Sequence, residues 1–171
     1  MYNTGNFGPE LCLPGGGGAR NRLKAVAQYS SSVPGDLEND TPHTVTFDAT
    51  AFQRGIVPIT YSEFRVATAG VYLLWAQVMI GHKNLNLAPG HTANSWFTVN
   101  GVAVAGAGGH VRTLLTSQGG IIAQAVVQLA AGDKIKLLVS GTDARMEPFS
   151  RQPLPSTLKE VPSASMTIQE I

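Results

Sequence analysis

The chain has 171 residues, a formal net charge of +1 and only 13% charged residues, with 19 glycines and 10 prolines. This length suits one domain with a sizeable core, and the near-neutral charge argues against nucleic acid or an anionic membrane as a partner. The charged fraction is about half that of an average globular protein. We therefore expect a β-rich chain with many turns, much of whose surface is covered in an oligomer.

A single cysteine, Cys12, excludes an internal disulfide, and no cysteine or histidine cluster has the spacing of a zinc site. The N-terminus has neither the basic start nor the unbroken apolar run of a secretion signal. The longest apolar stretch, Val71–Ile80, is about half as long as a membrane-spanning helix. These features predict a soluble protein that is made in the cytoplasm.

Residues 1–40 differ in composition from the rest of the chain. They contain the run Gly15–Gly18, which has a high conformational entropy when free, and the turn-rich residues 31–40. The sequence thus predicts an N-terminal arm and linker, ordered only where it lies against another surface. The basic residues could also contact nucleic acid, but so few charges are typical of a solvated arm. The candidate docking residues of the arm are Phe7, Leu11, Leu13, Arg20 and Arg22.

From Thr41 to Ile171 the pattern changes to apolar segments bordered by glycine, proline and asparagine, without a credible helix. This arrangement predicts one all-β domain over residues 41–171, an antiparallel sandwich or jelly roll. The pair Asn100-Gly101 predicts a tight hairpin within the fourth strand. The eight expected strands are residues 43–50, 59–68, 70–82, 93–105, 110–116, 120–131, 133–141 and 164–171.

The strand over residues 70–82 is mostly apolar on both faces. Strict alternation puts Tyr72 and Leu74 on one face and Leu73 and Trp75 on the other. A strand of a two-layer antiparallel sandwich normally leaves one face in water. We therefore expect the second face to be covered by another subunit. Residues 120–131 agree, because one face mixes apolar residues with glutamines and carries no charge, as interfaces often do.

Two stretches carry a family resemblance. The segment AGVYLLWAQVMIG resembles the third core strand of the tumour necrosis factor ligand family, on the residues Gly70, Tyr72, Leu73, Leu74, Trp75, Ala76, Gln77 and Val78. The later strand and turn are similar to the same family and to complement-type globular heads, on Gly119-Gly120, Gln128-Leu129 and Gly132-Asp133. The resemblance covers about Thr41 to Ile171, and its motifs occur in the family's order.

The resemblance implies a tumour necrosis factor-like jelly roll that assembles as a homotrimer. Carried over to this sequence, it predicts a threefold interface formed by Leu73, Trp75, Gln77, Ile122 and Gln124. It also predicts that the core of each subunit contains Tyr72, Leu74, Val127, Leu129 and Ile168. Both sets agree with the two faces read from the alternation.

The chain also departs from the family's cytokines, because no membrane anchor, collagen-like repeat or paired cysteines are present. Trimeric heads of this fold also occur on virus particles. Our first hypothesis is a structural virion protein, made in a host cytoplasm, that decorates a phage capsid or forms a spike. Its arm would dock onto a capsid or tail protein. The alternative is a receptor- or glycan-binding trimer, a fibre tip or cytokine-like ligand, with partner contacts in residues 84–93 and 142–163.

No motif predicts an enzyme or a cofactor. Asp133 lacks a catalytic partner, and we expect it to accept hydrogen bonds from backbone N–H groups at its turn. Ser117 is not in a nucleophile elbow, and Gly15–Gly18 lacks the lysine of a phosphate-binding loop. The four histidines, His43, His82, His91 and His110, lack the spacing of a metal site. A loop-borne site stays open for His82 and His91, which bracket residues 83–90, and so does a metal bound by one histidine from each subunit on a threefold axis.

Overall fold

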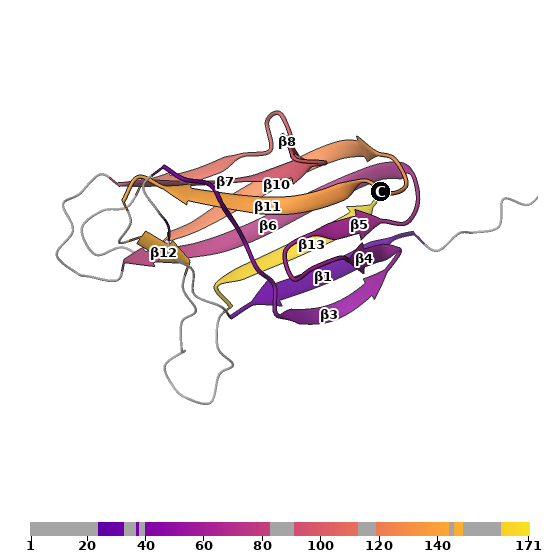
Figure 1. Ribbon diagram of the computed structural model, residues 1–171, viewed down its shortest axis with the longest axis horizontal. Coiled ribbons are helices and arrows are strands. Elements are labelled where there is room, and N and C mark those ends of the chain that lie inside the picture. The colour runs from indigo at the N-terminus through magenta and orange to yellow at the C-terminus, as the bar shows by residue number, and fades with distance from the viewer. Residues whose placement is uncertain are drawn as a thin grey trace, which may run out of the picture.

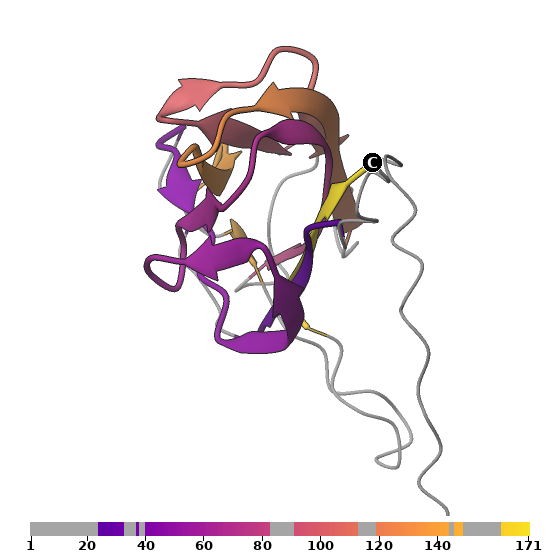
Figure 2. The same ribbon diagram turned by 90° about the vertical axis from the view of Figure 1, so that its right-hand side faces the viewer.

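The computed structural model describes residues 24–32, 37, 40–82, 91–112, 119–143, 146–148 and 162–171. In these residues the chain forms two antiparallel sheets that pack face to face, with no helix between them (Figure 1). Figure 2 shows the same two layers from one end of the sandwich. None of the described residues belongs to a helix that is long and apolar enough to cross a bilayer.

The first layer, the β6 sheet, has the strand order β10-β6-β13-β1-β3. The short strand β12 pairs with residues 80–82 of β6, next to the stretch of β6 that pairs with β13. Its strands are β10 (Gly119–Leu129), β6 (Gly70–His82), β13 (Ala164–Glu170), β1 (Val26–Ser31), β3 (Ala49–Arg54) and β12 (Met146–Pro148).

The second layer, the β11 sheet, has the order β4-β5-β11-β7-β8, and β2 and β9 pair with β11 and β7. Its strands are β4 (Ile56–Pro58), β5 (Phe64–Val66), β11 (Lys134–Gly141), β7 (Thr92–Val99), β8 (Val102–Ala103), β2 (His43–Thr44) and β9 (Gly109–Arg112). The predicted all-β jelly roll is therefore confirmed.

The β6 sheet includes residues that precede the predicted domain boundary at residue 41. Residues 26–31 form β1, which lies between β13 and β3 inside the β6 sheet. Ala25, Ala27 and Tyr29 point into the core and are almost fully buried. The sequence predicts a linker here because Ala25, Ala27 and Tyr29 form only a short alternation, in which the outward Val26 is apolar as well.

The strand predicted over residues 59–68 is shorter than expected. Residues 59–63 form a turn, in which the Ile59 N–H donates to the Glu63 carbonyl (2.8 Å), and β5 begins only at Phe64. The Thr60 hydroxyl accepts a bond from the Ser62 N–H (3.2 Å), so side-chain oxygens support the turn. This local bonding overrides the alternation of apolar and polar residues that predicted a strand from residue 59.

The core lies between the sheets, where the inward residues of alternating strands meet. Tyr72, Leu74, Leu129 and Ile168 are buried, as predicted, while Val127 is only partly buried against the core. Burial of large apolar side chains contributes about 1.5–3 kcal/mol each, which makes this cluster the main source of stability. At one end of the core three aromatic rings pack together, those of Tyr29, Phe47 and Phe64.

Two tight turns lie next to each other at one end of the β11 sheet. Asn100 and Gly101 both have positive φ (51° and 83°) and join β7 to β8 in a two-residue hairpin, as predicted. Asp133 accepts a bond from the Ala130 N–H (2.8 Å), which confirms its predicted role in a turn. It also accepts a bond from the Asn100 amide (2.8 Å), so the two turns are held together.

The two long sides of the sandwich differ. On one side β9 approaches β10 so closely that a Cβ on Gly109 would lie 1.9 Å from the Ile122 carbonyl oxygen. Only glycine permits this contact between two backbones. On the other side the sheets end in β3 and β4, and among the described residues each of these strands pairs with one neighbour only. The sandwich is thus closed at β9 and β10, and its opposite side ends in two edge strands.

Candidate functional site

The outward face of the β6 sheet is the first candidate site. Neighbouring strands are in register across it, so that side chains from β6 and β10 alternate in and out together. Leu73 lies opposite Val126, Trp75 opposite Gln124 and Gln77 opposite Ile122. The five residues predicted for the interface are therefore brought onto one face: Leu73, Trp75, Gln77, Ile122 and Gln124.

This face exposes large apolar side chains in a single chain. Val126 is 61% exposed, Ile122 52% and Val71 38%. Leu73 and Trp75 are partly buried by their neighbours. Adjacent exposed apolar side chains of this kind are typical of surfaces that bind a protein, a membrane or a ligand.

The same face carries no charge over four adjacent strands. The outward positions of β13 and β1 hold polar or small apolar residues, Ser165, Thr167, Gln169, Val26, Gln28 and Ser30. Those of β6 and β10 hold no Asp, Glu, Lys or Arg. Depletion of charge at the centre of a patch is the compositional mark of protein interfaces.

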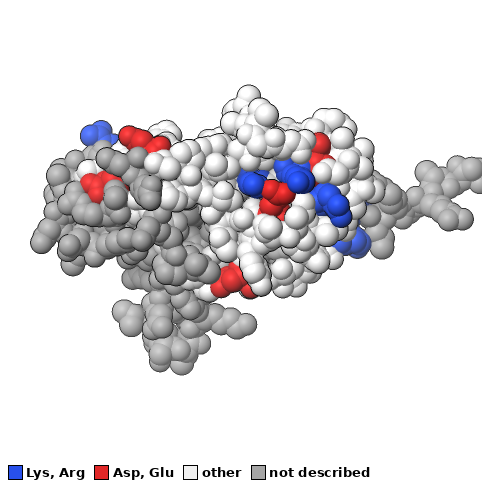
Figure 3. Space-filling view, viewed as in Figure 1, with Lys and Arg blue, Asp and Glu red and all other residues white. Residues whose placement is uncertain are grey.

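The β11 sheet has a different surface. Glu63 forms ion pairs with Lys136 (2.8 Å) and Lys134 (3.3 Å), and these lysines hold the pKa of the Glu63 carboxyl below its usual value. Figure 3 shows a group of basic side chains around an acidic one on the face that it views. Such exposed pairs are typical of a surface in contact with water.

Several predicted site residues lie outside the described residues. These are the docking residues Phe7, Leu11, Leu13, Arg20 and Arg22, together with most of the two loops proposed for partner binding. His91 lies within the described part, 3.5 Å from an oxygen of Asp143. Within the described ranges, no three histidine, cysteine, aspartate or glutamate side chains come together as metal ligands.

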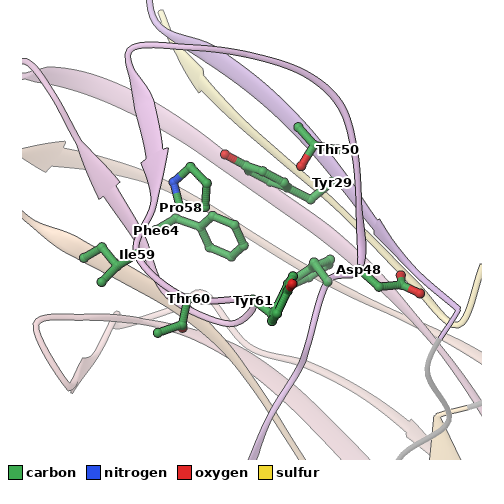
Figure 4. A pocket seen from close by; sticks show the side chains of 9 residues that line it. Tyr29, Asp48, Thr50, Pro58, Ile59, Thr60, Tyr61 and Phe64 are labelled. Atoms are coloured by element: carbon green, nitrogen blue, oxygen red, sulfur yellow. The ribbon is translucent and has the colours of Figure 1, made fainter.

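A second candidate site is a cavity of about 290 Å³ between β3 and the segment that joins β4 to β5 (Figure 4). Its floor is formed by the rings of Tyr29, Phe47 and Phe64, with centroids 4.2 to 6.3 Å apart. Its rim is formed by Asp48, Thr50, Pro58, Ile59, Thr60 and Tyr61.

The polar groups of this cavity have defined partners. The Tyr29 hydroxyl donates to the Gln53 side-chain oxygen (3.3 Å), and burial raises the pKa of Tyr29 to about 12. The Asp48 carboxylate accepts bonds from the Ser32 N–H (3.0 Å) and the Ser32 hydroxyl. The hydroxyl bond lowers the pKa of Asp48, so this carboxyl is ionised at neutral pH.

The sequence did not predict this cavity. Tyr29 lies in the segment expected to be a linker, and Ile59 and Tyr61 lie in a segment expected to be a strand. The alternation of Ala25, Ala27 and Tyr29 could have indicated β1. No sequence pattern indicates that three distant segments meet around one cavity.

The sequence matches no protein-family model and no curated protein. Solved structures with a similar fold include murine APRIL at pH 5.0, with a TM-score of 0.60 and 14% sequence identity over 87% of this chain and 100% of that one. The globular domain of zebrafish complement 1qA protein has a TM-score of 0.57 and 14% identity, over 86% and 98%.

A third similar structure is Eiger TNF from S. frugiperda, with a TM-score of 0.56 and 13% identity over 88% of this chain and 94% of that one. The match extends over nearly the whole of each neighbour, so it covers the complete sandwich and not a fragment. Identities this low establish a common fold and nothing further. The chain thus has the jelly-roll fold that tumour necrosis factor and complement globular domains share.

Proposed function

We propose that the protein is a homotrimeric, non-enzymatic binding module in which the outward face of the β6 sheet packs against two further copies. The observation that carries this proposal is the uncharged face with its exposed Ile122 and Val126. Each large aliphatic side chain gains about 1.5–3 kcal/mol on full burial, so this surface favours association. A threefold arrangement is what the resemblance to the tumour necrosis factor family implies.

Multi-angle light scattering tests the assembly, and a matched pair of variants tests the face. We expect a mass of three chains for the wild-type protein. Val126→Lys places three like charges in the proposed interface and should yield monomers. Val102→Lys is the control, because Val102 is as exposed (71%) but lies on β8 in the other sheet. A monomeric wild-type protein, or a trimer in both variants, would contradict the proposal.

The binding role follows from what assembly leaves accessible. With the β6 sheet covered, the β11 sheet and the loops at the ends of the sandwich remain for a partner. We propose a receptor or a glycan as this partner. A glycan array and a cell-binding assay with the trimer test this role, and the absence of binding in both would count against it.

We propose docking to a virus particle as a second candidate function. It is supported by the composition of residues 1–23, where a glycine run separates apolar residues from the domain. Lys24, the first described residue, comes two residues before β1. The protein would then be part of a virion, as a capsid-decorating or spike protein.

Deleting residues 1–23 separates the two functions. If the segment docks the trimer onto capsid or tail protein, the truncated chain keeps its three-chain mass but no longer sediments with particles. A truncated trimer that still binds particles would refute docking through this segment. A truncated chain that loses its trimer would place the segment in the assembly interface instead.

A further inference from the structure

The hairpin that joins β7 to β8 carries the pair Asn100-Gly101 at its tip. Both residues are exposed, and water reaches them from outside the sandwich. A Cβ built on Gly101 would meet no atom within 4 Å, so the space around this residue is open. None of the described residues accepts a hydrogen bond from the Gly101 N–H. The described part of the chain therefore leaves this backbone nitrogen available to react.

An asparagine that is followed by glycine can lose its side-chain amide in water. A base in the solvent takes the proton of the glycine N–H, and the nitrogen attacks the Cγ atom of the asparagine. The bond from Cγ to Nδ2 breaks, and the amide nitrogen takes back the proton and leaves as ammonia. Water then opens the five-membered succinimide to an aspartate or an isoaspartate. Glycine favours the attack because it has no Cβ to restrict its backbone.

The neighbouring turn holds the side chain that would react. The Nδ2 group of Asn100 donates to Oδ1 of Asp133 (2.8 Å), and Oδ1 of Asn100 accepts a bond from the Lys134 N–H (3.0 Å). The Asp133 carboxylate is itself held, because it also accepts a bond from the Ala130 N–H (2.8 Å). Both ends of the carboxamide must therefore leave their partners before Cγ can turn toward the Gly101 nitrogen.

We propose that Asn100 is a site of spontaneous deamidation, and that Asp133 and the Lys134 N–H slow this reaction in the folded protein. Water is the reactant that is consumed, and ammonia is released. Two hydrogen bonds of ordinary net strength correspond to about a tenfold factor in rate. Asp133 is thus a positioning residue, which keeps the Asn100 carboxamide away from the attacking nitrogen.

The modification changes the contact between the two turns. An aspartate at position 100 places a second carboxylate where the Asn100 amide donated to Asp133. Two ionised carboxylates repel each other, and neither can donate a hydrogen bond. An isoaspartate also adds one methylene to the backbone of a two-residue turn. Deamidation therefore separates the β7–β8 hairpin from the turn that precedes β11.

The rate of deamidation at mildly alkaline pH tests the protection. Trypsin cleaves after Lys83 and Arg112, so one peptide contains both Asn100 and Asn94, and its fragment ions show which residue has reacted. Asn94-Ser95 is the internal control, because Asn94 lies in β7 with β11 on one side and β9 on the other. We expect Asp133→Ala to deamidate about tenfold faster than the wild type at Asn100, with no change at Asn94.

Three results would overturn the protection. The first is an equal rate at Asn100 in the wild type and in Asp133→Ala. The second is a parallel rise at Asn94, which would attribute the effect to unfolding of the strand. The third concerns the wild type alone and holds even if the variant does not fold: a rate at Asn100 that is the same with and without concentrated urea.

An exchange of the two side chains tests the consequence for the turns. Asn100→Asp reproduces the charge of the product and should lower the urea concentration at the midpoint of unfolding. Combining it with Asp133→Asn lets the amide at position 133 donate to the carboxylate at position 100, so most of the loss should be recovered. A midpoint of Asn100→Asp equal to that of the wild type, or a double variant no more stable than Asn100→Asp, would overturn this part of the proposal.

Discussion

Val126 on β10 lies directly opposite Leu73 on β6, and both side chains point away from the core. If this pair is covered by a neighbouring copy, folding and assembly are coupled by mass action. We expect the melting temperature of the wild-type protein to rise with chain concentration. In Val126→Lys it should be lower and independent of concentration. Calorimetry over a hundredfold range of concentration measures both, and a constant melting temperature in the wild type would speak against assembly.

Asp133 holds two turns together, and its removal should destabilise the fold. Asp133→Ala leaves the Ala130 N–H and the Asn100 amide without their acceptor. Loss of these bonds should lower the free energy of unfolding by about 1–3 kcal/mol. Asp133→Asn retains one acceptor oxygen and should lose less. Urea unfolding measures the difference, and equal stability of all three proteins would show that the turns do not depend on this side chain.

Gly109 is required by the close approach of β9 to β10. Gly109→Ala brings a Cβ to 1.9 Å from the Ile122 carbonyl oxygen, so the strands must separate. We expect a loss of at least about 1–3 kcal/mol in the free energy of unfolding. Gly108→Ala is the matched control, because its Cβ would meet its nearest neighbour, the Ser95 carbonyl oxygen, at 3.6 Å. If both variants unfold at the same urea concentration, the contact between the strands is not tight in solution.

Tyr29 should make the protein less stable at alkaline pH. Its pKa is about 12 in the folded chain and about 10 when unfolded, so between these values the unfolded state binds fewer protons. Stability contributed by the neutral phenol is present below pH 10 and lost as pH rises toward 12. Two pKa units correspond to about 2–3 kcal/mol.

Comparison with Tyr29→Phe isolates this effect from other groups that titrate at high pH. The phenylalanine keeps the ring contacts of the core and has no proton to lose. Melting temperatures of both proteins should be compared from pH 8 to 11.5. We expect the wild type to fall more steeply above pH 10, and parallel curves would contradict a buried, neutral Tyr29.

The features that the sequence predicted well are those fixed by neighbouring residues. Asn100-Gly101 needs positive φ at both positions, and the outward and inward residues of β6 follow from alternation alone. The features it missed depend on contacts between distant segments. Tyr29 is in the core because β1 inserts between β13 and β3, and no pattern within residues 25–31 specifies those neighbours.

The same distinction applies to the candidate sites. The proposed assembly face lies on adjacent strands, and the periodicity of β6 and β10 predicts which residues share it. The cavity joins Tyr29, Asp48 and Tyr61 from three segments, and a turn at residues 59–63 replaces the expected strand. Its charge and shape depend on packing between edge strands, which single-sequence patterns do not encode.

The start of β1 and the end of β13 are antiparallel neighbours, with Val26 opposite Gln169. The Ala25 N–H donates to the Glu170 carboxylate (3.0 Å), and the Glu170 N–H donates to the Ala25 carbonyl (2.8 Å). A short peptide could therefore bridge Ile171 to Lys24, while the exposed hairpin at Gly101 is opened instead. Such a circularly permuted chain would keep every strand pairing except that of β7 with β8. Its new termini would lie at the end of β7 in the β11 sheet, so a protein fused to a terminus would sit beside that sheet and not beside the β6 sheet.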